Sequence, residues 1–143
     1  MAIDQEILEV SNMFRLLVKK ASQDWNRGAC KMNLSFPQFQ ILYSLNQRGP
    51  MKVSELADAL NLTSAAITGL ADKLSSYSYV ERERATDDRR VVYIKITDVG
   101  IHAIDSVKET YSEMIGRLFN QLSKEDIQHL RRIFAQMLVN IDN

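Results

Sequence analysis

The sequence predicts a mainly α-helical, α+β fold built around a helix-turn-helix. Three observations carry this prediction. Long apolar stripes at helical spacing lie towards both ends of the chain, two short helical patterns lie near its middle, and a charged period-two pattern follows them directly. The chain has 143 residues, which fits one domain-sized core. We expect a helix-turn-helix lobe at residues 35–99 and a helical dimerisation region formed by residues 1–34 and 100–143.

Residues 3–27 predict the first long helix. Apolar side chains recur there at alternating steps of four and three, which places them on one helical face, and Gly28 is expected to break the run. A second helix is expected to start at Ser35, because Ser35 and Gln38 are spaced to form a capping box. This helix is expected to end before Gly49.

Residues 53–60 and 64–76 predict two short helices with a tight break between them. Thr63 stands where it caps the second helix. Two helices joined in this way form a helix-turn-helix, whose second helix enters the major groove of DNA in proteins that bind it. A shared apolar core is supplied by Leu56, Leu60, Ile67, Leu70 and Leu74.

Residues 79–97 switch to the period of a β-strand. Arg82 and Arg84 fall on one face of the first strand, residues 86–89 carry turn chemistry, and residues 91–96 form a second strand rich in β-branched side chains. A charged hairpin directly after a helix-turn-helix predicts a two-stranded wing, which makes the lobe a winged helix.

The terminal helices carry more apolar surface than the lobe can cover. Thr97 and Asp98 are expected to cap a helix with an apolar stripe over 101–122, and Ser123 is expected to open a last helix with a stripe over 127–141. A compact lobe cannot bury all of these stripes. A second copy of the chain, related by a two-fold axis, would cover them. The alternative is an elongated monomeric helical hairpin.

The bulk composition excludes several classes of protein. Lys+Arg and Asp+Glu both number 18, so the net charge is zero, which excludes a strongly basic DNA-coating protein but not a local basic patch. Cys30 is the only cysteine, so no internal disulfide and no cysteine-based zinc site is expected. No apolar run approaches the length of a membrane span, and the N-terminus lacks the pattern of a signal peptide. We expect a cytoplasmic protein with no cofactor and no metal.

The motif Asp88-Arg89-Arg90, followed by Ile96-Thr97-Asp98-Val99-Gly100, resembles the wing signature of the MarR family of winged helix-turn-helix transcriptional regulators. Residues 56–60 and 67–74 resemble the helix-turn-helix of that family, and residues 36–42 resemble its second helix. The likeness spans nearly the whole chain. It implies a homodimer that binds a pseudo-palindromic DNA operator, in a repressor role, and that a small aromatic or phenolic ligand releases.

Two departures from the family pattern stand next to the DNA-binding elements. The family usually has glycine just after the recognition helix, where this chain has Ser78. A left-handed helix cap is less favourable for serine than for glycine. The sequence therefore does not decide which conformation the cap adopts. A larger polar residue is common where Gly69 stands. Glycine there reads no base through a side chain, but it allows close approach of the backbone to DNA at some expense of helix stability.

The candidate DNA contacts lie on the recognition helix and the wing. Hydroxyl groups bond bases or phosphates, and methyl groups meet the thymine methyl, although Thr63 and Ser64 also serve as helix caps. The resemblance implies that Arg90 enters the minor groove and that Asp88 positions it; the alternative is a solvated tip with a weak surface ion pair. The expected set is Thr63, Ser64, Ala65, Thr68 and Lys73 on the helix, Arg82, Arg84, Asp88, Arg89 and Arg90 on the wing, and Lys52 as a phosphate contact.

An effector pocket and a redox site are secondary expectations. Trp25, Met32, Phe36, Phe39 and Tyr43 gather around the first two helices, where they would line a pocket for an aromatic ligand or simply form core. Some members of the family sense oxidants through a cysteine near the N-terminus. Cys30 is a candidate for this role, and a small packed cysteine is the alternative.

Two rival classes stand against a DNA-binding regulator. An enzyme is not expected, because the sequence has no glycine-rich phosphate loop, nucleophile elbow or metal-spaced histidine and cysteine set. A winged-helix module that binds another protein stays open, because residues 50–100 carry seven basic and eight acidic side chains. Salt-dependent binding to DNA separates the two possibilities.

Overall fold

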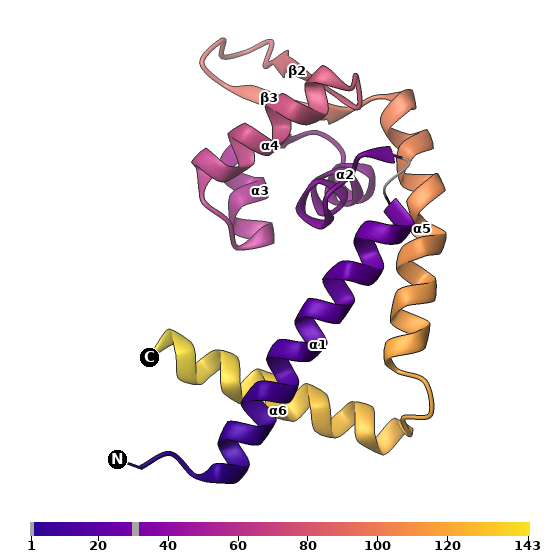
Figure 1. The fold of residues 1–143 in the computed structure, drawn as a ribbon. Helices are drawn as coiled ribbons and strands as arrows, with labels where there is room; N and C mark the ends of the chain where they lie inside the picture. Colours follow the sequence, from indigo (N-terminus) through magenta and orange to yellow (C-terminus); the bar gives the residue numbers. More distant parts are fainter. Residues whose placement is uncertain (1, 30–31) are drawn as a thin grey trace. The chain divides into compact units, whose positions relative to one another are not determined.

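The computed structural model describes residues 2–29 and 32–143 and confirms a mainly helical winged-helix fold (Figure 1). The chain divides into two compact units, Met1–Tyr111 and Ser112–Asn143. The split into a lobe and a dimerisation region stays a prediction. The described elements are α1 (Gln5–Ala29), α2 (Phe36–Arg48), β1 (Met51–Lys52), α3 (Val53–Leu60), α4 (Ser64–Ser76), β2 (Val80–Arg84), β3 (Val92–Ile96), α5 (Asp98–Leu118) and α6 (Lys124–Asp142).

Helix α1 continues through Gly28 to Ala29, so the expected break at Gly28 is wrong. A Cβ atom at Gly28 would lie 2.2 Å from Cγ2 of Thr110 in α5. The glycine therefore serves a close approach between two helices of the first unit. The Thr110 hydroxyl also donates a hydrogen bond of 3.4 Å to the Gly28 carbonyl oxygen.

The start of α2 is the capping box that the sequence predicts. The Gln38 backbone N–H donates to Ser35 Oγ at 3.3 Å, and the Ser35 backbone N–H donates to Gln38 Oε1 at 2.9 Å. The helix ends before Gly49, whose φ of 80° lies in the left-handed region that glycine tolerates.

Helices α3 and α4 form the helix-turn-helix with the predicted bounds. Asn61 turns the chain between them with a φ of 54°, and Thr63 Oγ1 accepts a bond of 3.1 Å from the Ala66 backbone N–H. Helix α2 packs against both helices and against β3. The side chains that this packing buries completely are Ile41, Leu42, Leu45, Leu56, Ile67, Leu74 and Ile94.

The wing belongs to a three-stranded antiparallel sheet rather than to a two-stranded hairpin alone. Its strand order is β1-β3-β2, with Met51 opposite Ile94 in one pair and Val80 opposite Ile96 in the other. Strand β3 begins at Val92, one residue later than predicted. Strand β1 precedes α3 and pairs with β3, so it joins the start of the helix-turn-helix to the wing through backbone hydrogen bonds.

The end of α4 is a Schellman cap made with serine. Ser78 takes a left-handed φ of 63°, its N–H donates to Ser75 O at 2.9 Å, and the Tyr79 N–H donates to Leu74 O at 3.0 Å. The cap therefore keeps the geometry that glycine normally provides. The departure at Ser78 changes the residue that bears the conformation, not the conformation itself.

The second unit holds the end of α5 and the whole of α6. Helix α6 starts with a capping box, in which Asp126 N–H donates to Ser123 Oγ at 3.0 Å and Ser123 N–H donates to Asp126 Oδ2 at 2.9 Å. The Ser123 bonds hold the pKa of Asp126 below its ordinary value of 3.8. Within the described ranges, no helix combines the length and the apolar character that a membrane crossing requires.

Candidate nucleic-acid interface

Helix α4 presents one side to the core and one side to solvent. Ile67, Ala71 and Leu74 are buried. The opposite side, here called the exposed face of α4, carries mostly small polar side chains and a single carboxylate. Its members are Ser64, Ala65, Thr68, Gly69, Asp72, Lys73 and Ser76. All the predicted recognition-helix contacts from Ser64 onward therefore lie on one accessible surface, with Thr63 exposed at its N-terminal end.

Arg90 at the wing tip is held by Asp88. Its Nε and Nη2 atoms donate to the two oxygens of Asp88 at 3.2 and 3.3 Å, and its backbone N–H donates to Asp88 Oδ1 at 3.0 Å. These bonds hold the pKa of Asp88 below its ordinary value of 3.8, with a larger effect from the Arg90 side chain than from its backbone N–H. The side chain of Arg90 is nevertheless 91% exposed. The Asp88 bonds thus hold the backbone and the side chain of Arg90 in place, while its guanidinium group stays exposed to solvent.

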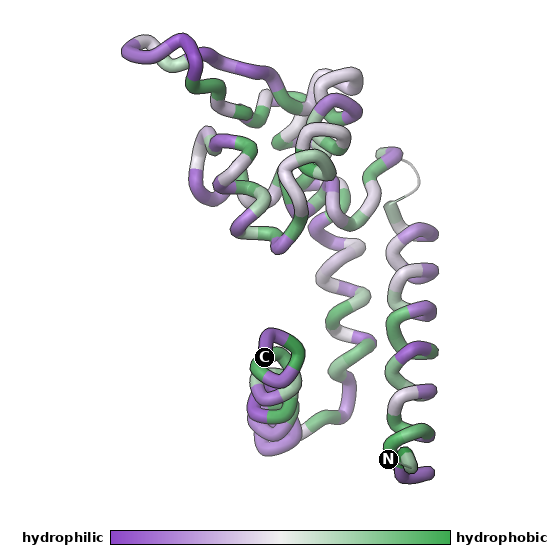
Figure 2. The backbone as a smooth tube through the Cα atoms, turned by 90° about the vertical axis from the view of Figure 1, so that its left-hand side faces the viewer, coloured by the Kyte–Doolittle hydropathy of each residue, from purple (hydrophilic) through white to green (hydrophobic). Residues whose placement is uncertain are grey.

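The two strand arginines of the wing bond to the protein itself. Arg84 Nη1 donates a bond of 2.7 Å to the carbonyl oxygen of Arg89, across the mouth of the hairpin loop. Arg82 forms an ion pair with Asp72 on the exposed face of α4. Arg89 itself is exposed in the hairpin loop, and most residues of this hairpin are hydrophilic (Figure 2). Arg82, Arg84 and Arg89 therefore occupy three different environments, all distinct from that of Arg90.

Lys52 is the last residue of β1 and the N-cap residue of α3, so it lies at the start of the first short helix of the helix-turn-helix. Its Nζ lies 6.0 Å from the centre of the Tyr93 ring on the neighbouring strand, at the outer limit of a cation–π contact. The Glu55 carboxylate accepts a bond of 3.3 Å from the Lys52 backbone N–H. The lysine side chain is half-buried beside the sheet.

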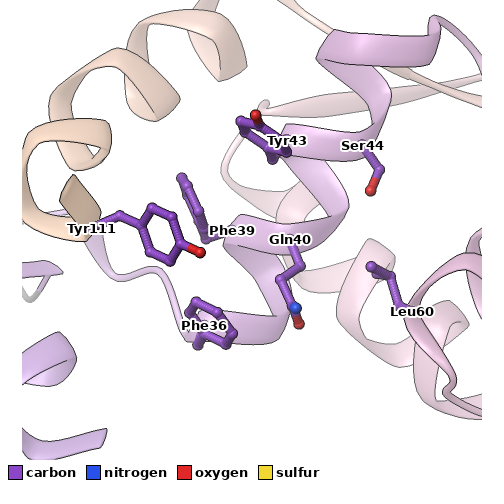
Figure 3. A pocket seen from close by; sticks show the side chains of 7 residues that line it. All are labelled: Phe36, Phe39, Gln40, Tyr43, Ser44, Leu60 and Tyr111. Atoms are coloured by element: carbon purple, nitrogen blue, oxygen red, sulfur yellow. The ribbon is translucent and has the colours of Figure 1, made fainter. Parts of the chain in front are cut away.

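A cavity of about 210 Å³ opens beside α2, and three of the five predicted effector residues line it: Phe36, Phe39 and Tyr43 (Figure 3). Trp25 is buried, with its ring 5.3 Å from that of Phe36, and its indole N–H donates to Leu34 O at 3.2 Å. Met32 lies elsewhere, with its carbonyl oxygen 3.4 Å from the Tyr79 hydroxyl. The remaining lining residues are Gln40, Ser44, Leu60 and Tyr111.

Sequence reasoning misses several of these relationships. Tyr111 fits an apolar stripe in the sequence, although its ring stacks 6.0 Å from that of Phe36. Asp72 is not recognisable as the partner of Arg82, because the two residues lie ten positions apart on different elements, α4 and β2. Cys30, the redox candidate, lies outside the described residues. Among residues 2–29 and 32–143, no cluster of three or more His, Cys, Asp or Glu is arranged to hold a metal ion.

Comparisons with known proteins agree with this architecture. The sequence profile of the MarR family matches residues 34–92. The transcriptional repressor MdtR of Bacillus subtilis (strain 168) is 26% identical over 134 residues, which cover 94% of this chain and 86% of MdtR. The crystal structure of the S. aureus MepR–DNA complex superposes with a TM-score of 0.84 at 23% identity, covering 91% of this chain and 96% of MepR. A cysteine-to-serine mutant of E. coli MarR, complexed with operator DNA, gives a TM-score of 0.81 at 21% identity and covers 96% and 99% of the two chains. The family profile, the relatives and the fold agree, and residues 34–92 carry the MarR family domain, a winged helix-turn-helix found in transcriptional regulators.

Proposed function

We propose that this chain is a sequence-specific double-stranded DNA-binding repressor that acts as a homodimer. The observation that carries the proposal is the outward-facing Arg90 guanidinium, fixed by Asp88 at the wing tip of the lobe that carries the exposed face of α4. A folded protein gains little from such an exposed pair, so its value lies in what it meets outside the protein. The solved structures of MepR and MarR with DNA support the same reading of the fold.

Each element takes a different groove of the duplex. The N-terminal half of α4 enters the major groove, where Ser64 and Thr68 offer hydroxyls and Ala65 offers a methyl group to base edges. Arg90 enters the minor groove, because a narrow minor groove concentrates negative potential and a guanidinium is weakly hydrated for a cation. Contacts to the DNA phosphates beside these grooves come from Arg84, Arg89 and Lys52.

The homodimer follows from apolar surface that the single chain leaves uncovered. On α1, Ile7, Val10, Phe14 and Leu17 are each about half exposed and share one helical face. Figure 2 shows hydrophobic residues recurring along this helix. Contiguous apolar surface of this extent is rare on monomers. Helix α6 adds a second exposed group, which is Ile133, Phe134, Met137, Leu138, Val139 and Ile141.

Size-exclusion chromatography with light scattering measures this assembly. Wild-type protein is expected at twice the mass of the chain. Phe14→Asp places a charge in the apolar face of α1 and is expected to give a monomer or a protein that does not fold. Lys19→Asp, on the polar side of the same helix, is the matched control and is expected to stay dimeric.

DNA binding is tested by selecting bound fragments from mixed genomic DNA and measuring a recovered duplex by fluorescence anisotropy. The dimer is expected to protect two half-sites roughly 34–36 Å apart. Arg90→Ala is expected to weaken binding about 10- to 100-fold without unfolding the lobe. Arg48→Ala, at the end of α2, controls for loss of one exposed positive charge. Absence of binding even at low salt would favour a winged-helix module for protein partners.

The aromatic cavity supports a second proposal, release from DNA by a small uncharged aromatic ligand. Four aromatic rings and the polar groups of Gln40 and Ser44 line it, and its lining includes no lysine, arginine or histidine. Its volume of about 210 Å³ suits a single ring, because an apolar cavity of about 150 Å³ already holds benzene. We expect phenol to bind more tightly than benzoate, since nothing in the lining compensates a carboxylate.

Fluorescence of Trp25 reports on this cavity, because its ring contacts those of Phe36 and Phe39 at 5.3 and 5.0 Å. Phenol is expected to change this fluorescence and to lower the affinity for the recovered duplex. Gln40→Leu is expected to weaken the phenol response while leaving DNA binding of the free protein intact. Equal responses to phenol and benzoate would contradict an uncharged ligand class.

A further inference from the structure

We propose that Arg82 supports DNA binding without contacting DNA, by compensating the negative charge that Asp72 places on the exposed face of α4. The inference rests on the proposed DNA-binding function and adds a role for two residues within it. Arg82 therefore acts through Asp72 and is a positioning residue rather than a contact.

Asp72 occupies an unusual place for a carboxylate. It lies near the middle line of the exposed face of α4, which runs through Ala65, Gly69, Asp72 and Ser76 at steps of four, three and four. It is the single acidic residue of that helix, and Lys73 is its single basic one. A helix that docks against phosphates thus carries a group that phosphates repel.

Arg82 reaches Asp72 from the wing. On β2, Val80 is 3% exposed and faces the core, and Arg82 follows it on the same side of the strand. Helix α4 and β2 are in contact, and the Arg82 Nη2 atom meets Asp72 Oδ1 there. The neighbouring acids Glu81 and Glu83 alternate with the arginines, and Glu81 and Glu83 therefore lie on the opposite side of β2.

The two aspartate–arginine pairs of the lobe differ in what they leave free. Arg90 is 91% exposed and bonds to a residue two positions away in its own loop, so its outer edge stays accessible. Arg82 is 45% exposed, and its partner stands on another element, with 58% of the Asp72 side chain exposed. The first pair presents a cation to the outside, and the second pair cancels an anion.

The approach of DNA increases the effect of this cancellation. In the free protein, an exposed pair is screened by water and stabilises the fold little. When a duplex covers the exposed face of α4, water leaves and the local dielectric falls, so an uncompensated carboxylate beside phosphates is repelled more strongly. Arg82 prevents this repulsion by keeping the pair neutral.

A double-mutant cycle on the duplex recovered from genomic selection tests the proposal. Arg82→Ala is expected to weaken binding about tenfold, while Asp72→Asn alone changes it by less than about threefold. Asp72→Asn introduced into the Arg82→Ala protein is expected to restore binding to within about threefold of wild type. Arg82→Lys keeps the charge and is expected to bind like wild type.

The controls separate this inference from the proposed function and from misfolding. Lys108→Ala removes one member of the Lys108–Asp105 pair on α5, whose exposed fractions of 44% and 58% match those of the Arg82 pair, and it is expected to bind like wild type. Circular dichroism and thermal unfolding are expected to be alike for all variants. The inference would be overturned if Asp72→Asn changed DNA affinity equally in the wild-type and the Arg82→Ala proteins, or if it did not restore the affinity of Arg82→Ala. Failure of the wild-type protein to bind the duplex would overturn the proposed function instead.

Discussion

The side-chain hydroxyl of Thr97 donates a hydrogen bond of 2.6 Å to the backbone carbonyl oxygen of Ser78. The same oxygen atom of Thr97 accepts a bond of 3.0 Å from the Gly100 backbone N–H, and the Thr97 N–H donates to Tyr79 O at 3.0 Å. One threonine therefore ties the end of α4 to the end of the wing and to the start of α5. A Cβ atom at Gly100 would lie 2.2 Å from the Tyr79 carbonyl oxygen. Glycine at position 100 therefore lets the start of α5 approach the Tyr79 carbonyl that accepts the Thr97 bond.

Replacing Thr97 by valine is expected to destabilise the protein by about 1–3 kcal/mol. Valine keeps the shape but removes both side-chain hydrogen bonds, which leaves a carbonyl and an N–H without these partners. Urea unfolding of the full chain measures the change. Thr86→Val, at the exposed hairpin turn, is the matched control and is expected to change stability by less than about 0.5 kcal/mol.

Replacing Ser78 by glycine is expected to stabilise the protein by about 0.5–1 kcal/mol. The left-handed conformation of Ser78 is unfavourable for a residue with a Cβ atom, and glycine adopts it freely. Chemical unfolding should show a higher midpoint with an unchanged slope. The same change at Ser76, the last residue of α4, is expected to lower stability, because glycine there adds flexibility and removes the bond of 2.6 Å that Ser76 Oγ donates to Lys73 O. A loss of stability with Ser78→Gly would mean that the serine side chain contributes something beyond its conformation.

Gly69→Ala is expected to stabilise the fold and to weaken DNA binding. A Cβ atom at Gly69 meets no protein atom within 4 Å, so nothing inside the lobe requires glycine there, and alanine favours a helix by about 1 kcal/mol. If α4 docks closely at this position, the added methyl group separates helix and duplex. Gly116→Ala in α5 also meets no neighbour and is expected to raise the melting temperature without affecting binding. Unchanged affinity for Gly69→Ala would show that the groove has room at this point.

The contribution of Arg90 to DNA affinity is expected to be independent of pH between about 5.5 and 8. The pKa of Asp88 is lowered below 3.8, so the carboxylate is charged throughout this range. A group with a lowered folded pKa stabilises the structure at higher pH and loses this effect only as the pH falls through the lowered value. The ratio of wild-type to Arg90→Ala affinity, measured by anisotropy at both pH values, checks this. Asp88→Asn is expected to reproduce, at neutral pH, the uncharged side chain that protonation of Asp88 would produce in acid.

Much of the lobe was predictable because its signals are local. The bounds of α3 and α4 follow from a cap at Thr63, a turn at Asn61 and apolar residues at helical spacing, all within one stretch of chain. The capping boxes at Ser35 and Ser123 were predictable for the same reason. Such features depend on residues three or four positions apart, whose relation the sequence displays directly.

The features that were not predictable depend on contacts between distant segments. Strand β1 has two residues and exists because Met51 and Lys52 pair with Ile94 and Tyr93 of β3, far along the chain. Gly28 has the character of a helix end, and only the proximity of Thr110 explains why glycine stands inside α1. The place of Tyr111 in the aromatic cavity depends on how α5 meets α2 within the first unit.

The bond from Arg84 to the Arg89 carbonyl closes the hairpin loop on itself before any partner arrives. Together with the Asp88–Arg90 pair, it removes conformational freedom from the loop during folding. A ligand that meets such a preorganised tip does not have to order it, so less of the binding energy is lost as entropy. The wing would then associate with DNA as a rigid body, and removal of the Arg84 side chain would lower affinity by loosening the tip as well as by deleting a phosphate contact.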